Sequence, residues 1–111
     1  MGKGYIVNAF SINMLDRNIF PCSVSIDDLT PFTSNIKQTI TNFIKSGYKS
    51  CIGHKDLANI VGVEFNRETV ILEKGDMAIV VQYIGERLPE GTTELPENAE
   101  IRLYRVVVNY F

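Results

Sequence analysis

The feature that most constrains the fold is a change in hydrophobic period between residues 26 and 29. Residues 19–26 alternate apolar and polar side chains, which is the two-residue repeat of a half-buried strand. Apolar side chains then recur at steps of three and four, as in an amphipathic helix: Leu29, Phe32, Ile36, Ile40, Phe43 and Ile44. A chain that switches between these periods packs helices against a sheet, so the predicted class is α/β.

Strand patterns cover six segments: residues 4–10, 19–26, 48–52, 68–73, 76–83 and 101–110. Pro21 lies near the start of the second segment and favours an edge position, because proline donates no ladder hydrogen bond. Gly75 would supply the positive φ of a hairpin between residues 68–73 and 76–83. We expect one domain over residues 1–111, with a mixed sheet of about five strands flanked by helices.

Two helices are expected between these strands. Thr30-Pro31 is typical of a cap and first turn, which places the first helix at residues 31–45. The second begins at Gly53-His54 and extends to about residue 61, where Gly62 ends it. His54 therefore lies at a strand-to-helix corner, where backbone N–H groups favour an anion.

Composition and charge exclude several classes of protein. A net charge of −2 and a pI of about 5.3 argue against a protein that coats duplex nucleic acid through a basic face. No segment approaches the roughly 18 apolar residues of a membrane span, so we expect a soluble intracellular protein. Cys22 and Cys51 lack metal-ligand spacing and are expected to be free thiols, although their spacing permits a disulfide.

The residues suited to catalysis are the single histidine, His54, and a cluster at residues 86–91. An imidazole moves protons near neutral pH, and the guanidinium of Arg87 matches a phosphate with a planar fork of donors. The carboxylate of Glu90 can accept a proton or orient a hydroxyl. These three residues suit phosphodiester cleavage without a metal, because the acidic residues are scattered and two-metal sites hold ions about 4 Å apart.

Simpler interpretations of the same residues remain open. Cys51 and His54 could form a thiol–imidazole dyad, although strand alternation favours burial of Cys51. Arg87 and Glu90 could be a solvated ion pair beside a turn. An aromatic group near the end of the chain fits sheet core or a dimer contact better than a platform for bases: Tyr104, Tyr110 and Phe111.

Four motifs resemble one known family in their order and spacing: Asn8-Ala9-Phe10-Ser11, Ile52-Gly53-His54, Asn66-Arg67 and Arg87-Leu88-Pro89-Glu90-Gly91. Over residues 4–110 the chain resembles the type III anti-CRISPR ring nucleases, which are small proteins of archaeal viruses. The resemblance implies a homodimer that cleaves cyclic tetra-adenylate without a metal or other cofactor. The products would be linear di-adenylates ending in a 2′,3′-cyclic phosphate, and type III CRISPR signalling in the host cytoplasm would be disabled.

The resemblance also implies roles for individual residues. His54 matches the catalytic histidine, Arg87 the phosphate-site arginine and Glu90 the active-site glutamate of the family. Ligand-binding positions are matched by Asn8, Ser11, Asn13, Gly53 and Arg67. The chain departs from the family at Glu86, which places a negative charge beside Arg87, and at the acidic residues 92–100, where the family has a variable lid.

Two other functional classes fit the sequence. One is a protein that sequesters a cyclic nucleotide without cutting it, which differs from the enzyme only in the role of His54. The other is a viral structural or DNA-associated protein, against which the low pI and the lack of a basic helix count. Asn8 and Ser11 also fit a strand-end turn, and Arg67 fits a surface charge.

Overall fold

A five-stranded mixed sheet in the order β2-β5-β4-β1-β3 organises the computed structural model, which describes residues 2–109. The strands are β1 Gly4–Val7, β2 Val24–Asp28, β3 Lys49–Cys51, β4 Met77–Ile84 and β5 Glu100–Val108. The α-helices are α1 Ile36–Lys45 and α2 Lys55–Val61. Short 3-10 turns occur at Ile12–Met14, Arg17–Ile19 and Thr30–Phe32. The predicted α/β class, with a mixed sheet of about five strands, is confirmed.

Strand β4 is bonded along both of its edges. It pairs in parallel with β1 and antiparallel with β5, and its residues 78–81 are all buried, as in a strand covered on both faces. Residues 68–73 therefore find no free edge beside it, and the predicted hairpin is wrong. Leu72 instead bridges to Leu15, while its N–H donates to the Met14 carbonyl at 2.6 Å. Gly75 keeps the predicted positive φ, at 88°.

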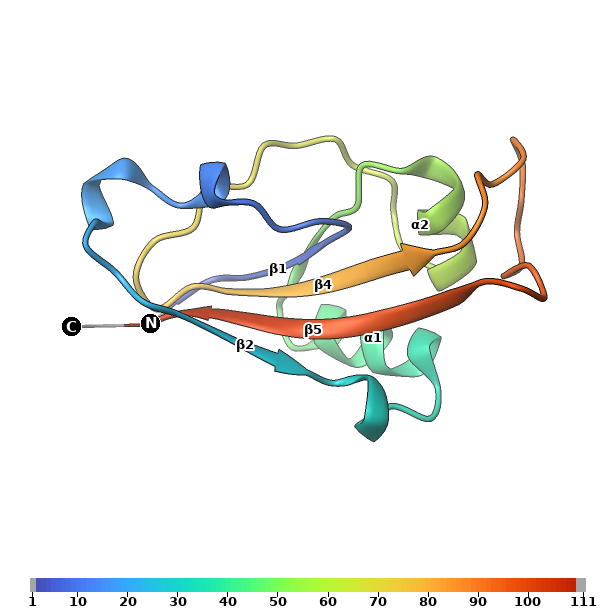
Figure 1. Cartoon of the computed structure of the whole chain (residues 1–111), viewed down its shortest axis with the longest axis horizontal. Helices are drawn as coiled ribbons and strands as arrows, with labels where there is room; N and C mark the ends of the chain where they lie inside the picture. Colours follow the sequence, from blue (N-terminus) through green and yellow to red (C-terminus); the bar gives the residue numbers. More distant parts are fainter. Residues whose placement is uncertain (1, 110–111) are drawn as a thin grey trace.

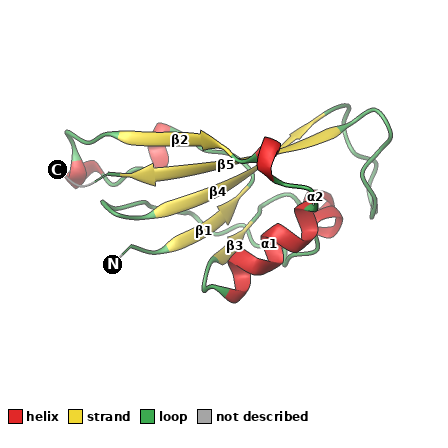
Figure 2. Cartoon of the chain, turned by 90° about the horizontal axis from the view of Figure 1, so that it is seen from below, coloured by secondary structure: helices red, strands yellow, loops and turns green. Residues whose placement is uncertain are grey.

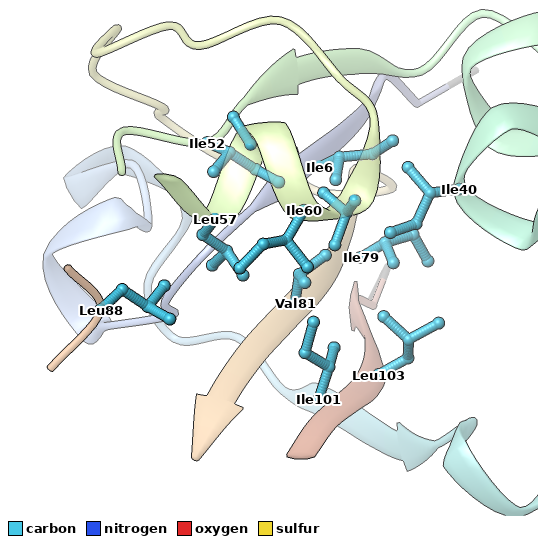
Figure 3. Packing of buried hydrophobic residues seen from close by; sticks show 12 residues of the cluster. Ile6, Ile40, Ile52, Leu57, Ile60, Ile79, Val81, Leu88, Ile101 and Leu103 are labelled. Atoms are coloured by element: carbon cyan, nitrogen blue, oxygen red, sulfur yellow. The ribbon is translucent and has the colours of Figure 1, made fainter. Parts of the chain in front are cut away.

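The two faces of the sheet are covered differently. Helices α1 and α2 lie against one face, as Figure 2 shows. There Ile79, Val81 and Leu103 belong to the same core cluster as Ile40 and Leu57, and Figure 3 shows this packing. The second face carries a separate cluster built with residues from the irregular segments before β2 and before β4: Val7, Leu15, Cys51, Val70, Leu72, Ala78, Val80, Val106 and Val108.

The start of the first helix differs from the prediction. Thr30-Pro31 begins a 3-10 turn, and Thr33 then adopts extended dihedrals that interrupt the helix. The N-cap of α1 is Asn35, whose side chain accepts the Gln38 N–H at 3.0 Å. The hydrophobic steps of three and four continue across this interruption, so they could not reveal it.

Strand β2 lies at an edge of the sheet, which confirms the prediction, although Pro21 itself precedes the strand. It begins at Val24 instead of residue 19, because Arg17–Ile19 forms a 3-10 turn. Strand β1 ends at Val7 and β5 ends at Val108, both short of their predicted ends; Tyr110 and Phe111 lie outside the described residues. Cys22 and Cys51 are free thiols, and burial raises the pKa of the Cys51 thiol. The described helices include none with the length and apolarity to cross a membrane.

Asp28, at the end of β2, joins this edge strand to β5. Its carboxylate accepts the Thr30 N–H at 2.9 Å and pairs with Arg102 at 2.7 Å. The hydrogen bonds from Thr30, and then the Arg102 guanidinium, hold the pKa of the Asp28 carboxyl below its usual range.

We expect Asp28→Asn to lower the Tm at neutral pH. A folded-state pKa below the unfolded value of about 3.9 gives stabilisation that is present above that pH and is lost as pH falls through the folded value. The Tm difference between wild type and variant should therefore shrink as pH falls from neutrality to about 3. Circular dichroism melts measure this, with the exposed neighbour Asp27→Asn as control. A difference that stays constant with pH would contradict the assignment.

Candidate functional site

The residues predicted to act in chemistry follow the carboxyl ends of parallel strands. β1, β3 and β4 are mutually parallel, so these ends meet at one end of the sheet. Asn8 follows β1, His54 follows β3 and Arg87 follows β4. Figure 1 shows α2 and the connection that leaves β4 at this same end. Open α/β sheets commonly bind ligands outside the carboxyl ends of their strands.

His54, Arg87 and Glu90 line one surface hollow of about 460 Å³, together with Asp56, Leu88 and Pro89. The structure thus brings together the three residues that the sequence proposed as a catalytic set. All three are exposed and accessible to a ligand. Glu86 is exposed and does not line the hollow, so its charge lies outside it.

Two contacts hold residues 87–91 against α2. Leu88 is only 6% exposed and joins the core cluster that contains Leu57, as Figure 3 shows. The Gly91 N–H donates to Asp56 Oδ1 at 3.0 Å. Sequence reasoning missed Asp56, because an acidic residue in the first turn of a helix is common and signals no site by itself.

His54 is the N-cap of α2, where its ring Nδ1 accepts the Leu57 N–H at 3.2 Å. A nitrogen that accepts a hydrogen bond carries no proton, so the neutral ring in this position bears its proton on Nε2. That N–H is the donor left for a ligand. The Leu57 N–H, by contrast, is already bonded and is no longer a free anion donor. The predicted end of α2 is confirmed, since Gly62 adopts a left-handed φ of 79°.

Asn8 and Arg67 hold the peptide group that precedes His54. The Gly53 N–H donates to Asn8 Oδ1 at 3.0 Å, and Arg67 Nε donates to the Gly53 carbonyl at 3.2 Å. The Arg67 guanidinium also lies over the Phe65 ring, 5.4 Å from its centroid. Asn8, Gly53 and Arg67, all predicted to bind ligand, therefore meet beside His54. Asn8 Oδ1 and Arg67 Nε, however, bind the Gly53 backbone and fix the turn between β3 and α2.

Ser11 and Asn13 do not line the hollow. Both are exposed on the 3-10 turn that follows β1, where the Ser11 N–H donates to Met14 Sδ at 3.4 Å. Cys51 belongs to the core cluster on the second sheet face and does not line the hollow of His54 either. Within residues 2–109, no group of three His, Cys, Asp or Glu side chains is arranged to hold a metal ion.

A second hollow, of about 350 Å³, lies on the sheet face opposite the helices. Val80, Gln82, Tyr104 and Val106 line it from β4 and β5, with Ile26 from β2 and residues 8–10. Ile26 is 59% exposed, so within residues 2–109 its side chain is left largely uncovered at this hollow. Asn8 lines this hollow and also bonds Gly53, which connects the open face to the His54 corner.

Comparison with known proteins identifies a family and a similar solved structure. A family model described as STIV B116-like matches residues 4–106 of the chain. Among solved structures, B116 of Sulfolobus turreted icosahedral virus (STIV) is 29% identical, with a TM-score of 0.74. The alignment covers 96% of this chain and 99% of that one. A search of curated proteins found no match.

We expect His54→Ala to lower the free energy of unfolding by about 1 kcal/mol, because the Leu57 N–H loses its capping acceptor. His54→Asn should retain most of the stability, since Asn is among the preferred N-cap residues. Urea unfolding followed by circular dichroism compares the two variants with wild type. Equal losses of unfolding free energy in the two variants would show that the loss does not come from the capping hydrogen bond.

Proposed function

The chain belongs to the STIV B116-like family of archaeal virus proteins, and from this premise we propose that it is a metal-independent ring nuclease. Its proposed substrate is cyclic tetra-adenylate, cut to linear di-adenylates that end in a 2′,3′-cyclic phosphate. In the host cytoplasm this reaction would remove the messenger of type III CRISPR defence. The observation that carries the proposal is the shared hollow of His54, Arg87 and Glu90.

The proposed reaction uses a nucleophile that RNA itself supplies. The 2′-oxygen attacks the adjacent phosphorus, the bond from phosphorus to the 5′-oxygen breaks, and the two oxygens must lie in line. Arg87 stabilises the charge that develops on the phosphoryl oxygens. Glu90 accepts the 2′-hydroxyl proton, and the imidazolium form of His54 protonates the departing 5′-oxygen from Nε2, a contribution of roughly 10²–10⁴-fold.

A homodimer is part of the proposal. The open sheet face supports it, because Ile26 and the hollow beside Tyr104 are exposed in one copy and apolar enough to pack against a second. A two-fold dimer presents the same groups to opposite phosphates of a ring. The size of the His54 hollow also supports it, since 460 Å³ suits one or two nucleotides better than four.

A sequestering protein is the second candidate, and one observation favours it. His54 has a structural task as the N-cap of α2, so its presence does not require catalysis. The two candidates predict the same ligand and differ only in whether the ring is cut.

Wild-type protein incubated with cyclic tetra-adenylate in excess EDTA should yield linear di-adenylates with 2′,3′-cyclic phosphate ends by mass spectrometry. His54→Asn keeps an N-cap acceptor, so it should still bind the ring. Its cleavage rate should fall by a factor of about 10² or more. Arg87→Ala should weaken both binding and turnover, whereas its exposed neighbour Glu86→Ala should weaken neither.

The outcomes separate the candidates. Loss of activity in EDTA would contradict the metal-free reaction. Full cleavage by His54→Asn would remove His54 from the chemistry, and tight binding without cleavage by wild type would establish the sequestering protein.

We expect Ile26→Glu to shift the protein from dimer to monomer in sedimentation velocity, because it places a charge on the open sheet face. Ile44→Glu is the matched control, since Ile44 is an exposed isoleucine on α1, at the opposite face. A wild-type protein that sediments as a monomer at high concentration would refute the dimer. Dissociation by Ile44→Glu alone would place the interface on the helical side.

A further inference from the structure

We propose that Asp56 is a positioning residue that fixes Glu90 relative to His54 through its hydrogen bond to Gly91. The inference rests on the proposed function for its catalytic consequence, but the tether itself is a property of the ligand-free fold. Asp56 lines the same hollow as His54 and Glu90, and its Oδ1 accepts the Gly91 N–H at 3.0 Å. This bond joins residues 35 positions apart and links the connection after β4 to α2.

Arg87 and Glu90 are anchored at different points. Arg87 adjoins Leu88, which is only 6% exposed and belongs to the core cluster on the helix side of the sheet. Glu90 lies two residues farther along and adjoins Gly91, whose position the Asp56 bond defines. Loss of this bond should therefore displace Glu90 more than Arg87.

Hydrogen bonds close the chain around Glu90 into a local turn. The Pro89 carbonyl accepts both the backbone N–H and the side-chain hydroxyl of Thr92, which closes residues 89–92 into a turn. Gly91 has a left-handed φ of 84° and open space on the side where other residues carry a side chain. The Asp56 bond on one side and the burial of Leu88 on the other are thus two contacts that orient this turn against α2.

The charge of Asp56 supports a tethering role over a binding role. A carboxylate in a hollow that receives phosphate repels the ligand and lowers its affinity. A carboxylate that accepts a backbone N–H, and lies in the first turn of a helix, is instead well placed to stabilise a loop.

The test compares Asp56→Ala with Asp56→Asn, which keeps an acceptor oxygen but removes the charge. In steady-state cleavage, Asp56→Ala should lower kcat about tenfold with KM changed less than about twofold, because a small displacement of a catalytic group reduces turnover. Asp56→Asn should stay within about threefold of wild type. Asn59→Ala, an exposed change on the same helix, is the control.

Amide hydrogen exchange of Gly91, measured by NMR without ligand, reports on the hydrogen bond from Gly91 to Asp56 independently of activity. Exchange should accelerate in Asp56→Ala and not in Asp56→Asn. Equal exchange in all variants would overturn the tether, and an unchanged kcat in Asp56→Ala would overturn the positioning role. Equal kinetic changes in the Ala and Asn variants would assign the effect to charge and likewise overturn it. Failure of the wild type to cleave would refute the proposed function alone, since the exchange data still decide whether Asp56 holds Gly91.

Discussion

The double pairing of β4 is the constraint on which the rest of the structure depends. Because β1 occupies one edge of β4 and β5 the other, the segment before β4 must leave the sheet and cover its second face. The parallel pairing of β1 with β4, and of β3 with β1, sends three chain exits to one end. His54, Arg87 and Asn8 follow those exits, so hydrogen bonding within the sheet places the candidate site before any side chain in it forms a contact.

In the proposed mechanism, His54 has two tasks that require different protonation states. As the cap of α2, its Nδ1 must be unprotonated to accept the Leu57 N–H. As a general acid that transfers a whole proton, the ring is best used as an imidazolium, which has no acceptor nitrogen. The ring must then release the cap, at a cost of about 1 kcal/mol for a typical N-cap. Proton donation and the order of the first turn of α2 are therefore coupled in the proposed mechanism.

The sequence predicted local structure, such as helix ends, better than it predicted which segment pairs with which strand edge in the sheet. The end of α2 followed from Gly62, because its left-handed backbone conformation is one that glycine adopts without strain. Residues 68–73 looked like a strand, yet no free strand edge remained, and only the sheet order reveals this. The role of Asp56 could not be predicted from the sequence, because its partner Gly91 is distant in sequence and contributes only a backbone N–H. The family resemblance implied ligand contacts for Asn8 and Arg67, but a matching residue type does not show which side-chain atoms the fold already uses.

The charges in the hollow bear on how a polyanion could be held there. Arg87 shares the hollow with the carboxylates of Asp56 and Glu90, so the lining carries no excess of positive charge, and the whole chain has a net charge of −2. Long-range attraction is therefore weak, and affinity must come from donors placed close to each phosphate. A single hollow offers few such donors, whereas two copies acting on one ring raise the effective concentration of the second site once the first is filled. On the proposed function, a monomer would thus bind the ring poorly even with every residue of its own site in place, and the open sheet face would matter for catalysis as well as for assembly.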